Sequence, residues 1–240
     1  MSNVFFTSRV GVEWINDFHD NDCKQCDLSY CDDQVNGFYN HMGKHGHVKV
    51  FNFGNESAWE SDFRHPDFGG DSLNWSDDVH FCMVNDHGGN VNNVVRFSFS
   101  VKHKHCSVPS TKMQLGRKNL RWLAALGCDA VLNTHADHIC AVWSKPMKGV
   151  HIVCGYIGLA ADSLYTTRLG QDFADDICDG DSIAGSWVAR AYSAFTGDES
   201  IAIAAGSTRE EAIARRDRET LNWRDDVLTR TSWLAWKYRK

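Results

Sequence analysis

Residues 79–89, VHFCMVNDHGG, carry the clearest structural signal in this 240-residue sequence. The first half is a short apolar run, which is typical of a strand buried in a parallel sheet. The run ends in Asn-Asp-His-Gly-Gly, and two glycines allow a sharp turn that brings the backbone close to a ligand. Open α/β sheets bind ligands at the carboxyl ends of their strands. Histidine titrates near neutrality, so His87 is a candidate catalytic base, although a plain loop role stays open.

A second apolar run, LRWLAALGC, spans residues 120–128 and ends in Cys128. If it forms a strand beside the first, Cys128 and His87 lie at neighbouring strand ends. A Cys and a His that are distant in sequence but adjacent in the fold are a candidate nucleophile and base. Cysteine is also a common buried apolar residue, so a purely structural role for Cys128 stays open.

Length and composition predict one globular domain over residues 1–240. Hydrophobic residues make up 42% and charged residues 23%, and only three prolines occur, which argues against a linker. The net charge of −6 gives no reason to expect nucleic acid or an anionic membrane as partner. The sequence has no apolar run long enough to span a membrane, and MSNVFFTSRV lacks the pattern of a signal peptide. We therefore expect a cytoplasmic protein; its oligomeric state is not predicted.

Nine cysteines without an export signal predict reduced thiols rather than a disulfide framework. The polar loop after the first predicted strand offers an alternative. Cys23 and Cys26 have the spacing of a zinc knuckle, and His19 with Cys31 could complete four ligands. No second paired motif supports zinc, so we expect a surface loop with free thiols and no metal or other cofactor.

The other predicted elements alternate as in an α/β fold. Residues 9–15 and 47–53 alternate as strands around a helix at about residues 28–42, and this βαβ unit predicts a parallel pair. Strands are also predicted at residues 92–100 (one arm of a hairpin), 150–157 and 230–240 (an edge), with a strand or turn at 201–206. Helices are expected at residues 179–195 and after a capping box at Thr208–Glu211.

The segment 54–78 is long for a loop in a compact domain. One interpretation is a helix near residues 58–63 followed by an ordered loop. The other is a wall of a substrate cleft, made apolar by Trp59, Phe63, Phe68 and Trp75. The sequence does not choose between them.

The two strand ends resemble those of the caspase-like cysteine peptidases, the group that includes gingipains, clostripain, separase and the legumains. In that group a His-Gly pair ends one parallel strand, and a small residue followed by Cys ends the next; here these positions hold His87-Gly88 and Gly127-Cys128. The resemblance implies an α/β fold, a caspase-like three-layer sandwich with a mostly parallel central sheet flanked by helices.

Three other blocks, GVEWINDF, FNFGNESAWESDFR and GGDSLNW, are similar to a bacterial and archaeal family in which such blocks precede a His-Gly-Gly and a Cys. This resemblance spans most of residues 9–200 and carries no activity with it. Two departures from the peptidases concern the oxyanion hole. The resemblance implies that backbone N–H groups near the Cys and the His-Gly turn form it. Asn85 stands where a small or hydroxyl residue is usual, and Asp129 follows Cys128 where glycine is often found.

The resemblance implies a hydrolase with a Cys-His dyad that cleaves a peptide or small acyl substrate through a covalent acyl-enzyme. Cys128 would attack the carbonyl carbon, His87 would transfer protons, and the N–H groups of Gly88 and Cys128 would bind the oxyanion. Asp162, just beyond the 150–157 strand, is a candidate for selecting a basic side chain. Asp86 and Trp59 are further candidate substrate contacts.

Two other function classes stay open because fold does not determine function. One is a biosynthetic cyclase, ligase or acyl transferase that acts on a small molecule in the same pocket. The other is a non-catalytic binding module in which both His87 and Cys128 are structural.

Overall fold

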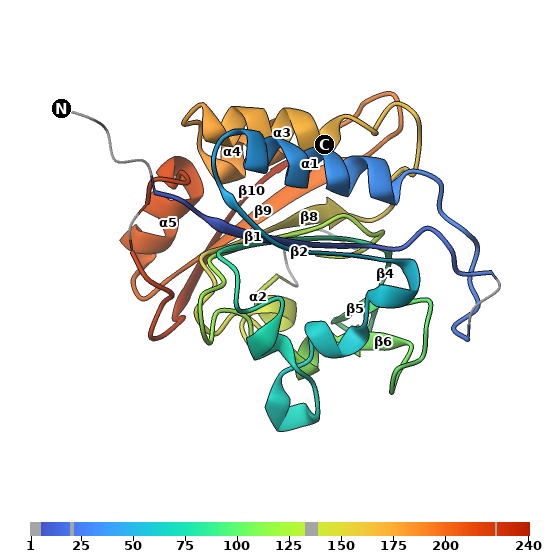
Figure 1. The fold of residues 1–240 in the computed structure, drawn as a ribbon. Coiled ribbons are helices and arrows are strands. Elements are labelled where there is room, and N and C mark those ends of the chain that lie inside the picture. Colours follow the sequence, from blue (N-terminus) through green and yellow to red (C-terminus); the bar gives the residue numbers. More distant parts are fainter. Residues whose placement is uncertain (1–5, 20–21, 133–138, 224) are drawn as a thin grey trace.

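The computed structural model describes residues 6–19, 22–132, 139–223 and 225–240, and its central feature is a seven-stranded sheet (Figure 1). The strand order is β10-β9-β8-β7-β3-β1-β2. The strands β2, β1, β3, β7 and β8 run parallel to one another. Strand β9 runs antiparallel to its two neighbours, β8 and β10. Their bounds are β1 Arg9–Trp14, β2 Val48–Gly54, β3 Phe81–Asn85, β7 Trp122–Ala125, β8 Ile152–Ile157, β9 Glu199–Gly206 and β10 Trp233–Arg239.

The three strands predicted to be most buried occupy the middle of this sheet. Every residue of β3, β7 and β8 is buried, as their continuous apolar runs predict. The predicted parallel βαβ unit is confirmed by the pairing of β1 with β2, and residues 233–239 form the predicted edge strand. Residues 201–206 belong to a strand, β9, rather than to a helical turn.

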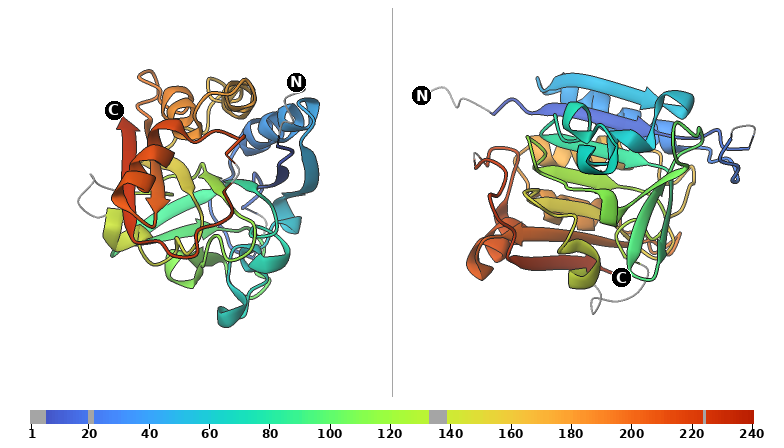
Figure 2. Two further views of the ribbon diagram at one scale, coloured as in Figure 1. Left: turned by 90° about the vertical axis from the view of Figure 1, so that its left-hand side faces the viewer. Right: turned by 90° about the horizontal axis from the view of Figure 1, so that it is seen from below.

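Helices cover one face of the sheet (Figures 1 and 2). They are α1 Cys31–Lys44, α3 Leu169–Cys178 and α4 Ile183–Arg190, with α5 Arg209–Arg218 packed against β9 and β10. The predicted capping box holds α5, because the Thr208 hydroxyl accepts the Glu211 N–H at 3.2 Å. The predicted helix at 179–195 is too long, since α4 ends at Arg190 and Phe195 is exposed. Helix α3 was not predicted.

The other face is covered mainly by short, irregular elements rather than by long helices. They are the short helix α2 Ile139–Trp143, five 3-10 turns and a small antiparallel sheet. That sheet contains β4 His87–Val91, β5 Val94–Ser98 and β6 Ser107–Pro109, which confirms the predicted hairpin arm. The expectation of flanking helices therefore holds on one face only. The 3-10 turns are Asn55–Ser57, Glu60–Asp62, Pro66–Phe68, Ser72–Asn74 and Ser110–Lys112.

The long segment 54–78 contributes core rather than a helix. Phe63 is fully buried and meets Phe97 edge-on, with ring centroids 5.5 Å apart. Trp75 packs in the same way against Phe53 of β2, at 5.0 Å. These aromatic side chains fill the irregular face of the sheet. The predicted helix near residues 58–63 is wrong, because that stretch holds only the 3-10 turn Glu60–Asp62.

A disulfide joins Cys23 to Cys106, with Cα atoms 5.4 Å apart. The expectation that all nine cysteines are reduced is therefore wrong at this pair. The two residues are 83 positions apart in the chain, so their meeting depends on the tertiary fold. The bond connects the loop between β1 and α1 to the turn before β6.

At the amino ends of the central strands lies a buried cluster of charged groups. The carboxylate of Glu219 accepts a hydrogen bond from the Trp122 indole N–H at 2.7 Å, and His151 Nδ1 lies 2.7 Å from the same oxygen. The carboxylate also accepts a hydrogen bond from Arg215 Nη1 at 2.9 Å. His151, Arg215 and Glu219 are at most 1% exposed. One carboxylate thus satisfies donors from β7 and α5 and contacts His151, which precedes β8.

We predict that Glu219→Gln destabilises the protein by about 3 kcal/mol, because it removes the fully buried counter-charge of Arg215. Urea unfolding followed by circular dichroism measures the change. Glu210→Gln, an exposed position on the same helix, is the matched control and should change stability by less than about 0.5 kcal/mol. Equal midpoints for the two variants would show that the cluster does not stabilise the fold.

Candidate functional site

The two candidate catalytic residues leave the sheet at the same edge. Strand β3 ends at Asn85 and β7 at Ala125, and these strands are parallel neighbours with Val84 opposite Ala125. His87 and Cys128 follow directly, and both line one small cavity of about 70 Å³. The carboxyl edge of the sheet therefore brings together two residues that are 41 positions apart in the sequence.

The imidazole of His87 is held from outside the sheet. Its Nε2–H donates a hydrogen bond of 2.7 Å to the carbonyl oxygen of Cys26, and its ring lies against Phe18 with centroids 4.7 Å apart. A carbonyl can only accept, so Nε2 carries a proton. In the neutral ring, Nδ1 is then the nitrogen that can accept a proton from a substrate or a thiol.

The thiol of Cys128 contacts the loop that follows β8. Its Sγ accepts the backbone N–H of Ala160 at 3.3 Å and donates to the Ala160 carbonyl at 3.5 Å. Among the hydrogen bonds of the described residues, none joins this Sγ to the His87 ring. Catalytic hydrogen bonds are often long or unformed before a substrate binds, so this geometry does not remove Cys128 as a candidate.

Close backbone contact fixes the two strand ends against each other. A Cβ atom at Gly88 would lie 2.1 Å from the carbonyl oxygen of Cys128, and one at Gly127 would lie 2.5 Å from the nitrogen of Gly88. Only glycine fits at these two positions. Asp129 has a left-handed φ of 52°, and its N–H donates to Gly158. The turn after Cys128 thus adopts a conformation that glycine favours, although the sequence has Asp there.

The candidate substrate contacts lie in different places. Asp162 lines the cavity, but its carboxylate accepts the backbone N–H groups of Ser29 and Tyr30, the latter at 2.8 Å. Asp86 also lines the cavity. Trp59 does not: its ring stacks on His103 with centroids 4.3 Å apart. No other residue of the 54–78 segment lines this cavity, so the structure does not make the segment a wall of it.

Asp86 is the polar group at the cavity whose hydrogen bonding is least complete. It is only 3% exposed, and neither carboxylate oxygen makes a hydrogen bond of ordinary length within the described residues. Burial raises the pKa of Asp86 well above its usual range, and the Ser98 backbone offsets this in part. Burial, and then the charges of Asp62 and Asp86, likewise raise the pKa of Glu13 on β1. Burial therefore disfavours the charged form of both carboxyl groups.

A second cysteine reaches the same cavity from α1. Cys31 is 1% exposed, and burial together with the charges of Asp162 and Asp86 raises its pKa. A thiol of this kind stays protonated and is a poor nucleophile. Cys128 is therefore the better nucleophile of the two.

The alternative of a zinc site at His19, Cys23, Cys26 and Cys31 is wrong. Cys23 is bonded to Cys106, so its sulfur is not available as a thiolate ligand. Within the described part of the chain, no three or more His, Cys, Asp or Glu side chains are grouped so that they could hold a metal ion.

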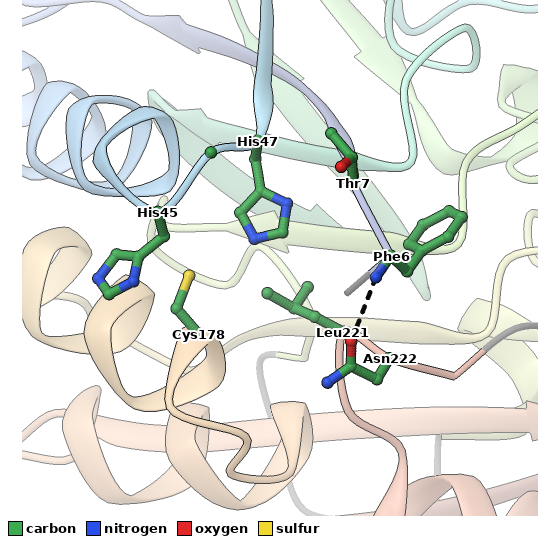
Figure 3. A pocket seen from close by; sticks show the side chains of 8 residues that line it. Phe6, Thr7, His45, His47, Cys178, Leu221 and Asn222 are labelled. Carbon is green, nitrogen blue, oxygen red and sulfur yellow. Dashed lines mark hydrogen bonds between the residues drawn. The ribbon is translucent and has the colours of Figure 1, made fainter. Parts of the chain in front are cut away.

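A larger cavity of about 170 Å³ lies at the opposite, amino-terminal edge of the sheet (Figure 3). Its polar groups are already engaged: His47 Nδ1 accepts the Ser8 N–H at 3.0 Å, and Asn222 accepts the Phe6 N–H at 3.4 Å. Burial, with nearby Asp175 and Asp179, raises the pKa of Cys178 to about 12. This cavity therefore lacks a reactive nucleophile and is the weaker candidate.

Sequence reasoning missed the groups that orient His87 and Cys128. The Cys26 and Ala160 contacts are made by backbone atoms, which leave no signal in residue type. Glu13 did leave a signal in the sequence: it is an acid between Gly11 and Ile15 on one face of the first predicted strand. Both faces of that strand are buried in the structure.

Comparison with protein families places the whole candidate site within one known domain. Residues 12–231 match the family model described as "Domain of unknown function (DUF6345)". The chain belongs to the DUF6345 family. The matched residues include both the His-Gly-Gly and the Cys blocks, but the family description gives no activity. No curated protein matches the sequence.

Among solved structures, the DUF6345 chain is similar to the Drosophila initiator caspase Dronc. The alignment covers 74% of this chain and 69% of the caspase, at 12% identity and a TM-score of 0.35. A similarity of this size does not bear on activity, so the fold is described by the chain's own mixed α/β order and mostly parallel sheet. In the described residues, no helix is long and apolar enough to cross a bilayer.

We predict that Gly88→Ala destabilises the protein by about 1–3 kcal/mol, because the new methyl group would overlap the Cys128 carbonyl and push the strand ends apart. Gly89→Ala is the matched control, since a Cβ there meets no atom within 4 Å. Urea unfolding of both variants measures the difference. Similar stabilities for the two would mean that the close contact between these strand ends is not maintained in solution.

Proposed function

We propose that this DUF6345 protein is a cysteine hydrolase that cleaves a peptide or small acyl substrate with Cys128 as nucleophile and His87 as base. The observation that carries the proposal is the shared cavity: both side chains line it, and each follows the carboxyl end of one of two neighbouring parallel strands, β3 and β7. The hydrogen bond from His87 Nε2 to the Cys26 carbonyl supports it, because that bond leaves Nδ1 as the proton acceptor.

In the proposed reaction, Cys128 releases the Ala160 carbonyl and gives its proton to Nδ1 of His87. The thiolate attacks the substrate carbonyl carbon, a C–S bond forms, and the imidazolium protonates the leaving group as its bond breaks. Water then gives a proton to His87 and attacks the acyl carbon. The acid product leaves, and Cys128 recovers its thiol proton from the imidazolium.

The N–H groups of Gly88 and Cys128 are the proposed oxyanion donors. Both belong to the two strand ends that touch, so they are close to the thiol and held by rigid backbone. A single preorganised donor of this kind contributes roughly 3–4 kcal/mol to the barrier reduction in other enzymes. The left-handed turn at Asp129 supports the close backbone approach at this position.

We propose that the cavity receives a basic side chain of the substrate. Its lining contains two acids, Asp86 and Asp162, and neither Lys nor Arg. Both oxygens of Asp162 already accept backbone N–H groups, whereas neither oxygen of Asp86 makes a hydrogen bond of ordinary length within the described residues. Asp86 is therefore the acid that would pair with a guanidinium or ammonium group, releasing its own proton when the cation binds.

A non-catalytic binding module is the second candidate function. The specific observation in its favour is that the Cys128 thiol contacts Ala160 rather than His87. In such a module the cavity would still bind a cation, but its thiol would have ordinary reactivity.

We predict that Cys128 reacts with iodoacetamide at about pH 6.5 faster than an ordinary thiol does, and that His87→Ala removes this advantage. Mass spectrometry of the Cys128 peptide gives the rate. Hydrolysis of model esters should be lost in Cys128→Ala and reduced about 10²–10⁴-fold in His87→Ala. Cys140, an exposed free cysteine, gives the ordinary rate within the same sample. A Cys128 rate equal to that of Cys140 and independent of His87 supports the binding module.

We predict that Asp86→Asn lowers kcat/KM by roughly 10–100-fold for substrates with a basic side chain at the scissile position. For neutral substrates kcat/KM should stay nearly unchanged. Because the cation must displace a proton from a carboxyl whose pKa is raised, apparent affinity for basic substrates in the wild type should rise with pH. Asp162→Asn is the control. If Asp162→Asn abolishes the preference for basic substrates and Asp86→Asn does not, Asp162 is the acid that selects them.

A further inference from the structure

The loop between β1 and α1 meets the candidate site through residues 22–28, which we call the tether segment. At one end Cys23 is bonded to Cys106, and its N–H donates to the Ser100 carbonyl at 2.9 Å. At the other end the Leu28 N–H donates to the Asn16 carbonyl, also at 2.9 Å. Cys26 lies between these two anchors.

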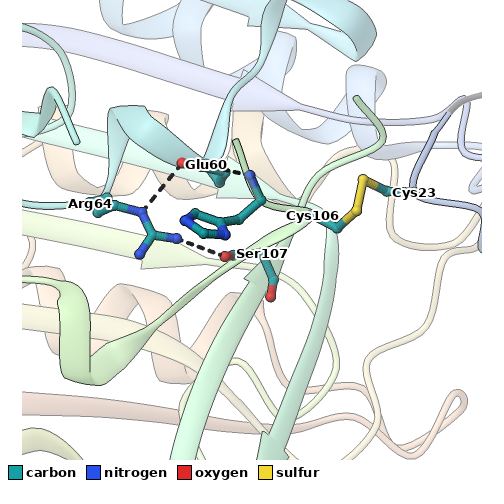
Figure 4. Close-up of a disulfide and its surroundings, with 6 residues drawn as sticks. Cys23, Glu60, Arg64, Cys106 and Ser107 are labelled. Carbon is teal, nitrogen blue, oxygen red and sulfur yellow. Dashed lines mark hydrogen bonds and ion pairs between the residues drawn. A yellow bond between two sulfur atoms is a disulfide. The ribbon is translucent and has the colours of Figure 1, made fainter. Parts of the chain in front are cut away.

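The Cys106 end of the disulfide is held on a rigid base (Figure 4). The N–H of His105 donates to the Glu60 carboxylate at 3.0 Å, and Arg64 Nη2 donates to the Ser107 carbonyl at 3.2 Å. Glu60 and Arg64 are buried and paired with each other at 3.6 Å. Because both neighbours of Cys106 are bound, the disulfide attaches the tether segment to a fixed part of the molecule.

The tether segment supplies the hydrogen-bond acceptor of His87. The carbonyl oxygen of Cys26, three residues after the disulfide, accepts the Nε2–H at 2.7 Å. Loss of the disulfide would leave the segment held by hydrogen bonds alone: the Cys23 N–H to Ser100 at one end, and the bonds of Asp27 and Leu28 to residues 16–19 at the other. The covalent link is therefore one of the restraints on the position of this acceptor.

We propose that the Cys23–Cys106 disulfide is a reducible tether that keeps His87 oriented, so that thiol–disulfide exchange at this bond controls the candidate site. The effect of the disulfide on activity rests on the proposed function. Its effect on the orientation of His87 does not. Cys106 is partly exposed whereas Cys23 is buried, so an incoming thiolate has better access to Cys106.

The exchange needs a dithiol as reductant. Its first thiolate attacks Sγ of Cys106, the bond between the two protein sulfurs breaks, and Cys23 leaves as a thiolate that takes up a proton. The second thiol of the reductant, as its thiolate, then attacks the mixed disulfide. Cys106 is released as a thiol, and the reductant becomes a cyclic disulfide, so that two electrons and two protons have passed to the protein.

The first test compares the oxidised wild type with protein reduced by tris(2-carboxyethyl)phosphine, which serves as the laboratory reductant and is removed before measurement. The amount by which His87 raises the Cys128 alkylation rate is the difference between the wild type and His87→Ala. We expect reduction to abolish most of this difference. We expect Cys23→Ser/Cys106→Ser to show the reduced-like rate with or without reductant. Reduction of the folded wild type gives the answer even if the double variant fails to fold.

Cys140→Ser is the matched control, because it removes an exposed cysteine on α2 that has no part in the tether. It should keep the full response to reductant. Identical alkylation rates of oxidised and reduced wild type would overturn the proposal. A reductant response that persists in a folded Cys23→Ser/Cys106→Ser protein would also overturn it, since the response would then arise elsewhere.

The second measurement separates the tether from the proposed chemistry. Ring ¹⁵N shifts of His87, assigned by their loss in His87→Ala, report whether Nε2 keeps its proton and its acceptor. We expect these shifts to change on reduction. If Cys128 alkylation proves independent of His87 but the shifts still change, the hydrolase proposal fails and the tether stands. Unchanged shifts on reduction overturn the tether whatever the reactivity of Cys128.

Discussion

Parallel pairing of β3 with β7 is the constraint on which the candidate site depends. The register sets Val84 beside Ala125, so both chains leave the sheet at one level, and their next residues must share a small space. Gly88 and Gly127 make this possible, because a side chain at either position would overlap the backbone of the other strand end. The positions of His87 and Cys128 thus follow from backbone packing, not from contact between their side chains.

The groups that orient these two residues come from loops. Cys26 offers its carbonyl to His87, and Ala160 offers its N–H and carbonyl to Cys128. Asp162 binds the two loops to each other through the N–H groups of Ser29 and Tyr30. A rigid sheet edge with polar loops above it is the usual way in which α/β folds build sites, since loops can vary while the strands stay in register.

The sheet is stabilised far from this edge. The cluster of His151, Arg215 and Glu219 lies at the amino ends of the central strands, where Glu219 satisfies buried donors from β7 and α5. The two faces of the sheet are covered differently. Helices pack on one face, whereas the segment 54–78 fills the other with aromatic side chains and with Glu60 and Arg64, which fix the turn beside the disulfide. This segment therefore supports the site without lining it.

The sequence by itself determined the central strands and the two strand ends that carry His87 and Cys128, because apolar runs and glycine pairs act locally. Only the tertiary structure decided which nitrogen of His87 carries the proton, that Cys23 meets Cys106 and that Asp86 is buried without full partners. The His87–Cys26 contact spans 61 positions and the disulfide 83. Helix α3 was missed although Leu169, Phe173 and Ile177 recur at helical spacing; this stripe is buried in the fold, where α3 packs against α1. Contacts of this range depend on how the whole chain is folded, and backbone acceptors have no residue type by which a sequence could reveal them.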